Sequence, residues 1–273
     1  MQSYIKNLKY SDEVKKIGAH HHDTHQILYV LNGNAQITVN NANYDLESGS
    51  LIFISRTESH SVNFVGEKYE RYEIRISPEI LNSAVKDNHL YSVLSNRPES
   101  FNRVIKLKTP ETVYIFKKIA EEFNGSAPYR EETLSMLLDM LLITVYRSYP
   151  KMFSVTDIPY FETVNKIQRQ FENDISKAYS LAELSAEYHI SKYYLSHIFK
   201  TVTGYSVMDY LKALRIAKAK ALLTKTTESV SEIVKICGFS DSSNFSREFK
   251  RNTGLSPRDF RKKHCIKIWR IVK

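Results

Sequence analysis

The stretch with the most reactive side chains lies near the N-terminus. The segment AHHHDTHQ, residues 19–26, contains four histidines in seven positions and leads directly into the apolar run ILYVL, residues 27–31. Imidazole nitrogens bind divalent metals and also hydrogen-bond polar small molecules. Such a cluster could serve metal-dependent catalysis or the recognition of a small ligand, or it could be a surface loop without a role.

Length and composition limit the kind of protein that holds these histidines. A chain of 273 residues is long enough for two domains, and its 42% hydrophobic content is typical of a folded protein. No apolar run approaches the roughly 20 residues that a membrane helix needs, and the N-terminus lacks the apolar region of a secretory signal. We therefore expect a cytoplasmic protein with no membrane partner.

Charge is distributed unevenly along the chain. Residues 1–159 carry 18 Lys and Arg against 19 Asp and Glu, whereas residues 160–273 carry 21 against 11. A positive excess confined to one domain favours nucleic-acid binding, because neutralised phosphates release their counterions. A basic surface that is merely solvated remains the alternative on charge alone.

The first eighty residues predict an all-β domain. Turns rich in Asn and Gly at 32–34, 40–43 and 48–49 separate short strand-like runs, and a spacing of about 8 to 12 residues is typical of a β-sandwich or barrel. The runs cover residues 27–31, 35–39, 43–46, 50–54, 61–65 and 69–76.

Helical periodicity follows Pro78. In residues 131–149 the apolar positions form one wide stripe, which predicts a helix that packs against a partner. The partner could be the domain's own barrel or a second subunit, and we favour dimerisation. The stripe consists of Leu134, Leu137, Leu138, Leu141, Leu142 and Val145.

A polar, aperiodic segment at residues 150–160 reads as a linker, since Pro150 and Pro159 lie near its two ends. It separates a first domain, residues 1–149, from a second domain, residues 161–273, in which every segment has helical periodicity. The sequence therefore predicts two domains of different class.

The second domain contains an internal duplication. SLAE at 180–183 and SVSE at 229–232 both fit the capping box that begins a helix, and HIFKTVTGYS at 197–206 matches REFKRNTGLS at 247–256. Each copy has the layout of a helix-turn-helix, at about 181–203 and about 230–253.

Single residues mark the ends of the helices in each copy. Ser191 and Asp241 are the expected caps of the two second helices, and Gly204 and Gly254 stand where those helices end. The second copy has one more residue in its turn, where Gly238 can adopt a positive φ.

The outward faces of the two second helices suit DNA. The faces that we expect to be buried consist of Leu195, Ile198, Phe199 and Val202 in the first copy and Phe245 and Phe249 in the second. The opposite faces combine hydroxyl, amide, imidazole, guanidinium and aromatic groups with no acid, a mixture that suits base edges and phosphates in a major groove. The predicted DNA-contacting residues are Lys192, Tyr193, Ser196, His197, Lys200, Ser242, Ser243, Asn244, Ser246, Arg247 and Lys250.

A long helix is predicted between the copies, at about residues 206–224, where the sequence contains neither Pro nor Gly. One continuous helix there would be about 28 Å long, close to the roughly 34 Å between successive major grooves on one side of DNA. A plain helix bundle with no nucleic-acid role is the alternative, and it leaves the duplicated caps and the acid-free faces unexplained.

The second domain resembles the DNA-binding domain of the AraC/XylS family of transcription regulators. The resemblance rests on the paired helix-turn-helix units, the long helix and the run GFSDSSNFSREFKRNTGLSPRDFR, residues 238–261. It implies base and phosphate contacts from the residues named above, apart from Lys192, Asn244 and Lys250. Asn244 stands where the family commonly has an aromatic residue or His.

The first domain is similar to the cupin-like sensor that many members of that family carry. Metal-binding cupins have His-x-His, a Glu seven residues before a Gly, and a later His. The matching residues here are His20, His22, Gln26 and His60, while Ser55 and Thr57 replace the Pro and Gly of the later motif. A neutral amide in place of the Glu weakens a site built from nitrogen and oxygen ligands.

We therefore favour a small-molecule pocket at the barrel mouth, formed by His20, His22, Gln26 and His60, over a metal site or a surface loop without a role. Arg71, Glu73 or Arg75 could add a charged contact if their face of the strand points inward. Strand alternation leaves open whether that face or the face of Tyr72 and Ile74 is the inner one.

The sequence thus predicts a two-domain α+β protein with a cupin-like β-barrel, a helical dimerisation segment and an all-α double helix-turn-helix domain. Its predicted function is sequence-specific transcription regulation, and the family resemblance implies activation controlled by a small polar effector such as a carbohydrate. The predicted partners are promoter DNA, a second copy of the chain and RNA polymerase, with no catalytic residue, cofactor or metal. The rival is a metal-dependent cupin enzyme with an accessory nucleic-acid-binding domain.

Overall fold

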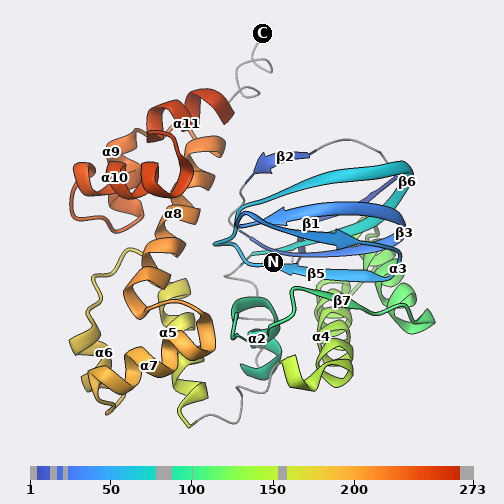
Figure 1. Ribbon diagram of the computed structural model, residues 1–273, viewed down its shortest axis with the longest axis horizontal. Coiled ribbons are helices and arrows are strands. Elements are labelled where there is room, and N and C mark those ends of the chain that lie inside the picture. Colours follow the sequence, from blue (N-terminus) through green and yellow to red (C-terminus); the bar gives the residue numbers. More distant parts are fainter. Residues whose placement is uncertain are drawn as a thin grey trace.

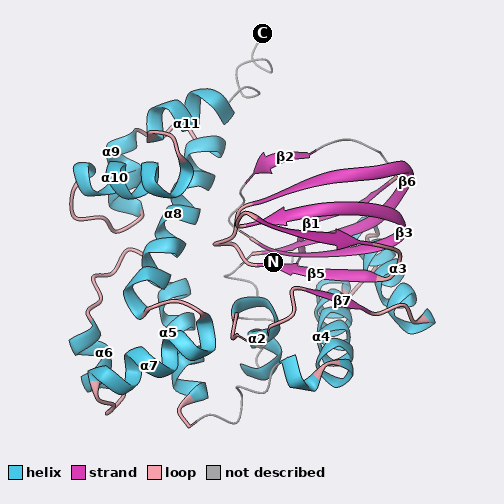
Figure 2. Cartoon of the chain, in the orientation of Figure 1, coloured by secondary structure: helices cyan, strands magenta, loops and turns pink. Residues whose placement is uncertain are grey.

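A computed structural model of the chain describes residues 5–12, 17–20, 24–77, 88–99, 101–152 and 159–264. The strands lie together with helices α2, α3 and α4, and helices α5 to α11 form a column beside them (Figure 1). Figure 2 shows the same division, with strands on one side of the molecule and the second half of the chain all helix and loop. The mixed α+β class predicted from the sequence is confirmed.

Two long antiparallel strands, β3 (His25–Val39) and β6 (His60–Ile76), form the centre of the sheet. Among the described residues, β1, β5 and β7 extend the sheet beyond one half of this pair, and β2 and β4 flank its other half. The bounds of the shorter strands are Ile5–Ser11 for β1, Ile17–His20 for β2, Ala42–Leu46 for β4, Ser50–Ile54 for β5 and Val104–Lys106 for β7.

Each long strand continues through a segment that the sequence predicts to be a break. The predicted turn at 32–34 is instead a bulge inside β3, where the register with β6 shifts twice. Gly33 has φ +87° there, and a Cβ at this position would lie 1.9 Å from the carbonyl oxygen of Lys68, so only glycine fits. The prediction of separate strands at 27–31 and 35–39, and at 61–65 and 69–76, is therefore wrong.

The other two predicted turns are confirmed. Asn40 and Asn41 have positive φ values of 47° and 70° between β3 and β4, and Gly49 has φ +88° before β5. Both turns use residues that tolerate left-handed backbone, which is the reason the sequence marks them.

Helices α2 (Asn88–Ser95), α3 (Pro110–Asn124) and α4 (Arg130–Ser148) contribute to a common core with one face of the sheet. Tyr29 of β3 stacks on Phe116 of α3 with ring centroids 4.7 Å apart. The apolar stripe of α4 belongs to this core, so its partner is the chain's own sheet rather than a second subunit. The fully buried members of the stripe are Leu134, Leu138, Leu141, Leu142 and Val145.

A second core lies on the opposite face of the same strands. Leu28 and Val30 of β3 and Ile52 and Ile54 of β5 pack there with Tyr69 of β6. All five are at most 1% exposed. Successive side chains of each strand therefore alternate between the helical layer and this second core. Residues from both halves of β3 enclose the second core, which we call the barrel interior.

Within residues 159–264, all of the regular secondary structure is helical. The bounds of the helices are Phe161–Asn173 for α5, Leu181–Glu187 for α6, Lys192–Thr203 for α7, Val207–Lys225 for α8, Val230–Ile236 for α9, Ser242–Thr253 for α10 and Pro257–His264 for α11. They build two separate apolar cores, and α8 contributes its first half to one core and its second half to the other.

The helix caps predicted from the duplication are confirmed. Ser180 and Ser229 each form a complete capping box with the Glu three residues later. Gly204 and Gly254 end α7 and α10 with φ values of +78° and +74°. These local signals are strong because each depends on only a few adjacent residues.

The turns inside the two copies are more alike than their lengths suggest. Gly238 has φ +72°, and His189 takes the same left-handed backbone, with φ +54°, at the matching place of the first copy. The additional residue of the second copy lies after this position, before the cap Asp241. None of the helices in the described part of the chain is long and apolar enough to cross a membrane.

Candidate nucleic-acid interface and effector site

The exposed face of α7 carries the residues predicted to contact the first half-site. Ser191 accepts a hydrogen bond from the backbone N–H of Tyr194 at 3.2 Å, which fixes where the helix begins. The face turned inward is at most 2% exposed and consists of Leu195, Ile198, Phe199 and Val202. The opposite face consists of the exposed Lys192, Tyr193, His197 and Lys200 and the half-buried Ser196. Tyr193 is 84% exposed, so its ring is available to a ligand.

Helix α10 has the same arrangement in the second copy. Asp241 accepts a hydrogen bond from the backbone N–H of Asn244 at 2.7 Å, and Phe245 and Phe249 are fully buried. The outward residues are the exposed Ser242, Ser243, Arg247 and Lys250 and the half-buried Asn244 and Ser246. Glu248 forms an ion pair with Arg251 at 2.6 Å, which neutralises the acid of this helix.

Helix α8 holds the two units apart. Tyr210, Leu211 and Leu214 pack in the first helical core, while Ala219 and Leu223 pack in the second. With 19 residues the helix is about 28 Å long. Figure 1 shows α7 near one end of α8 and α10 near the other. This geometry suits two consecutive turns of a duplex, for which the repeat is about 34 Å.

The predicted effector residues gather at one end of the barrel, as far as they are described. Gln26 pairs with Ile54 of β5, and His60 pairs with Val39 in the other half of the sheet. Both side chains are 1% exposed. The loop of residues 55–59 joins Ile54 to His60, so Gln26 and His60 lie at the same end of the barrel on its two halves.

The histidine cluster itself is only partly described. The backbone of His20 pairs with His60 between β2 and β6, while His22 lies outside the described residues. Within the residues that the structure describes, no group of three or more His, Cys, Asp and Glu could hold a metal ion. The ligand set of the rival enzyme, which needs His20, His22 and His60, thus falls partly outside the described chain.

The alternation of β6 answers which face of that strand points into the barrel. Tyr72 and Ile74 pack in the core shared with the helices, so Arg71 and Glu73 face the barrel interior. The guanidinium of Arg71 lies 5.1 Å from the ring centroid of Phe64 and 5.2 Å from that of Tyr69. Such cation–π contacts stabilise a buried positive charge.

The same face of β6 carries Glu73, which the sequence predicts as a charged contact on condition that this face points inward, and Tyr69, which it does not indicate. Glu73 forms an ion pair with Arg75 at 2.6 Å, next to Gln26 in the register of β3 and β6. Burial raises the pKa of the Tyr69 hydroxyl, which keeps it a neutral hydrogen-bonding group. Strand alternation could have identified both, once the inward face was known.

His25, the last histidine of the cluster, has a different environment. It lies on the side of β3 opposite Gln26 and is 1% exposed. Burial, followed by the charges of Arg56 and Arg97, lowers its pKa from 6.5 to about 3. His25 is therefore a neutral ring in a cationic setting, which the sequence pattern did not indicate.

Comparisons with known proteins agree with this arrangement. The sequence model of an AraC-like ligand-binding domain matches residues 11–136, and the model of a helix-turn-helix domain matches residues 184–263. The HTH-type transcriptional activator RhaR of Yersinia pestis is 24% identical over 245 residues, covering 89% of this chain and 84% of that protein. RhaR of Cronobacter sakazakii is 26% identical over 247 residues, covering 89% and 86%.

Solved structures show the same fold. ToxT from Vibrio cholerae O395 superposes with a TM-score of 0.59 at 16% identity, covering 96% of this chain and 98% of that chain. Wild-type ToxT bound to an unsaturated fatty acid gives 0.58 at 16% identity, covering 93% of each chain. Since a ligand-binding domain of the AraC type precedes a helix-turn-helix domain in one chain whose relatives are transcription activators, this protein belongs to the AraC/XylS family of transcription regulators.

Proposed function

We propose that the protein activates transcription by reading promoter DNA with α7 and α10 when a small polar effector binds in its barrel. One observation carries the DNA-reading half: two outward helix faces without an unpaired acid lie toward opposite ends of one continuous helix. Its RhaR relatives are transcriptional activators, which supports activation as the sign of regulation. A boundary at residues 150–160 divides sensor from DNA-binding domain in this proposal.

Binding to a selected operator tests the reading helices. His197→Ala together with Arg247→Ala removes one side chain from each helix, and each good base contact contributes about 1–3 kcal/mol. The double variant should therefore bind the operator more weakly by about one to four orders of magnitude in fluorescence anisotropy, and footprints should disappear at both half-sites. Arg147→Ala, which removes a charge from the exposed side of α4, is the matched control.

The selected sequence also separates this proposal from a nonspecific DNA binder. A regulator with two reading helices prefers its operator over random duplex by about 10³-fold or more. Equal affinity for operator and random duplex, with a steep salt dependence for both, would contradict the assignment of α7 and α10.

The effector half rests on polar side chains inside the barrel. Gln26 and His60 lie at the barrel mouth, and Arg71 adds a buried charge deeper in the interior. These groups suit a ligand with hydroxyl or carboxylate oxygens, such as a carbohydrate. A panel of sugars, sugar acids and fatty acids should reveal it by raising the melting temperature, and Gln26→Leu should abolish that rise. A hit only among fatty acids would overturn the carbohydrate class.

Dimerisation is proposed through a different face of α4 from the one that the sequence favoured. Met136, Met140 and Ile143 are 69%, 39% and 37% exposed and recur at helical spacing. Met136→Lys together with Met140→Lys should convert a dimer to a monomer in analytical ultracentrifugation while the melting temperature stays unchanged. A dimer that survives both substitutions would place the interface elsewhere.

In this proposal the protein activates transcription by acting on RNA polymerase. It does so in the cytoplasm, where promoter DNA lies. The proposal excludes catalysis as the main role of the barrel. Metal analysis of the purified protein distinguishes the rival: one equivalent of iron, manganese or zinc that is lost on substitution of His20, His22 and His60 would support a cupin enzyme.

A further inference from the structure

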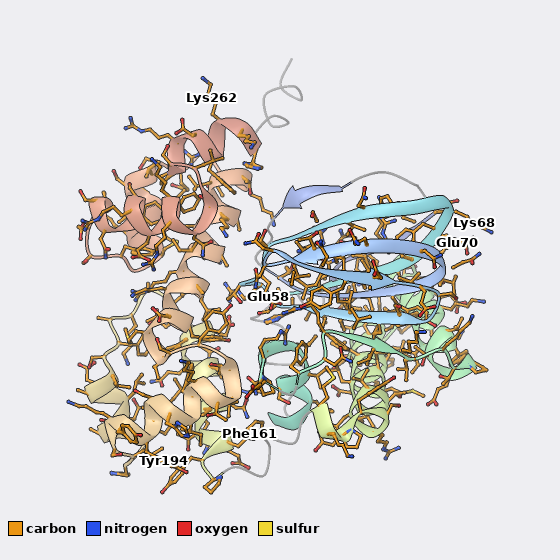
Figure 3. The ribbon with its side chains drawn as sticks, viewed as in Figure 1. Glu58, Lys68, Glu70, Phe161, Tyr194 and Lys262 are labelled. Carbon is orange, nitrogen blue, oxygen red and sulfur yellow. The ribbon has the colours of Figure 1, made fainter. Side chains whose placement is uncertain are left out.

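The loop of residues 55–59 connects the candidate effector site to the DNA-binding helices. It begins after Ile54, the strand neighbour of Gln26, and ends at His60. Glu58 lies at the end of the barrel nearest the helical column (Figure 3). We call this segment the junction loop. Because only one or two residues separate the strand ends from this loop, any shift of the strands at the barrel mouth displaces the loop as well.

The sensor side fixes the conformation of the junction loop. The backbone N–H of Ser55 donates to the Glu58 carboxylate at 2.7 Å, and Arg103 donates to both of its oxygens at 2.9 Å and 2.7 Å. Arg97 adds an ion pair at 3.4 Å. Burial acts to raise the pKa of Glu58, but the two guanidinium groups and the hydrogen bonds outweigh it and hold the pKa below its usual value. The carboxylate therefore stays charged and keeps the loop closed around it.

The other side of the junction loop contacts the DNA-binding domain. Arg56 forms a buried ion pair with Glu172 of α5, and Thr57 hydrogen-bonds the hydroxyl of Tyr205 just before α8. At the end of α2, Asn96 donates to Asn165 of α5 at 3.5 Å. These contacts hold the first helix-turn-helix unit close to the sensor.

The same contact brings sensor residues beside the first reading helix. His197, Lys200 and Thr201 of α7 line a hollow of about 830 Å³ together with Arg97, Pro98 and Glu99 of the sensor. Arg247 and Lys250 of α10 are not among the residues that line it. The two reading helices therefore differ in what lies next to them.

Sensor residues lie beside the outward residues His197 and Lys200 of α7, where a duplex bound to this helix would run. A helix with its side chains is about 10–12 Å across and fills a major groove about 12 Å wide, so the two phosphate backbones lie directly on either side of it. Residues 97–99 line the same hollow as His197 and Lys200, and the negative charge of Glu99 there repels phosphate. We therefore expect insertion of α7 into a groove to require the sensor to move away.

We infer that the junction loop is an autoinhibitory contact: through Arg56–Glu172 and Thr57–Tyr205 it holds α7 against the sensor, and a change at the barrel mouth releases it. The inference rests on the proposed function, since it needs α7 to read DNA. It assigns the regulation to named side chains that connect the strands bearing Gln26 and His60 to α5 and to Tyr205, which pack in the same core as the first helix-turn-helix unit.

Operator binding by full-length variants without added effector tests this inference. Glu172→Gln and Tyr205→Phe each weaken one contact without touching the outward face of α7. Both should raise operator affinity at least about threefold, and about tenfold if one molecule in ten of the wild type is open. The radius of gyration from small-angle scattering should also increase, because the sensor no longer holds the first unit.

Matched controls carry the same chemical changes away from the junction. Glu187→Gln alters an exposed acid that contacts Gln170, and Tyr188→Phe removes a hydroxyl that donates to Gln170 at 3.2 Å. Neither should change operator affinity. If Glu172→Gln lowers the melting temperature into the assay range, Tyr205→Phe and the exchanged pair Arg56→Glu with Glu172→Arg decide the question, and the exchanged pair should restore wild-type affinity.

Failure of the inference and failure of the proposed function give different results. Unchanged or weaker operator binding by folded Glu172→Gln and Tyr205→Phe, while wild-type protein still prefers its operator, overturns the autoinhibitory contact alone. Wild-type protein that shows no preferred operator overturns the proposed function, and the inference falls with it.

Discussion

The two helix-turn-helix units share their local construction and differ in their surroundings. Both begin with a capping box, and both end the second helix at a glycine with φ near +75°. A Cβ on Gly204 would lie 2.9 Å from the carbonyl oxygen of Arg97 in the sensor, whereas a Cβ on Gly254 would meet nothing within 4 Å. The duplicated sequence thus specifies the shape of each unit, and the rest of the chain decides which unit is held.

Because the two helical cores are separate, a substitution in one core should destabilise that helix-turn-helix unit alone. Phe199 and Phe249 are both fully buried, one in each helical core. Replacing either with Ala removes a ring from a packed core, which costs about 3–5 kcal/mol. Hydrogen exchange by mass spectrometry should show faster exchange in α6 and α7 for Phe199→Ala and in α9 and α10 for Phe249→Ala. Equal loss of protection in both units for either variant would show that they form one cooperative core.

Acid should weaken the sensor, because His25 of β3 is buried near the charges of Arg56 and Arg97. Its folded pKa of about 3 is below the unfolded value of 6.5, so the unfolded chain binds a proton that the folded chain does not. The stability that the neutral ring contributes is complete above pH 6.5 and is lost as the pH falls towards 3, by up to about 1.4 kcal/mol per pH unit.

Urea unfolding between pH 6.5 and pH 4.8 measures this slope. The window stays above the pKa of Glu58 in both states, since that pKa is 4.5 in the unfolded chain and lower in the folded protein. His25→Gln should flatten the pH dependence of stability, and His197→Gln on the exposed face of α7 is the control. Parallel slopes for wild type and His25→Gln would mean that the ring is not held neutral by its surroundings.

Substitution of the two end glycines compares the surroundings directly. A side chain at positive φ costs about 1–2 kcal/mol at either position, so Gly204→Ala and Gly254→Ala should both lower the stability of their own unit. Gly204→Ala should in addition raise operator affinity, because its methyl group displaces the sensor at Arg97. An equal response of operator affinity to both substitutions would remove the distinction between the units.

Substitutions in the capping boxes should have the smallest effect on stability, and the effect should be similar in the two units. Ser180→Ala and Ser229→Ala each remove a hydrogen bond to the backbone N–H three residues later, at 3.1 Å and 3.2 Å. Each should cost about 1 kcal/mol in urea unfolding, and replacement by Gly only a few tenths. A much larger loss at Ser180 would mean that the first unit depends on its cap for contact with the sensor.

What could be predicted from the sequence was local. The caps at Ser180 and Ser229, the buried face of α7 and the glycine at the end of α10 each depend on residues three or four positions apart, and the structure has them as predicted. Short-range geometry of this kind is set by backbone hydrogen bonds and helical periodicity, which a single sequence displays.

What could not be predicted depends on partners far along the chain. Gly33 looks like a turn, but the close carbonyl of Lys68 makes it a bulge. The apolar stripe of α4 shows that a partner exists without showing that the partner is its own sheet. Arg56 and Glu172 are 116 residues apart, and nothing in either neighbourhood indicates that they pair. For the effector residues, the resemblance to the cupin motifs indicated Gln26 and His60, while Arg71 required knowledge of which face points inward.

The continuous helix α8 has a consequence for the promoter. Because its two halves are embedded in different cores, the angle between α7 and α10 around the duplex axis is set by the protein. B-form DNA rotates once in about 10.5 base pairs, so inserting five base pairs between half-sites would turn one of them to the far side, whereas inserting ten would return it to the same side. The spacing of regulated promoters must therefore follow the helical phase that this single rigid element imposes.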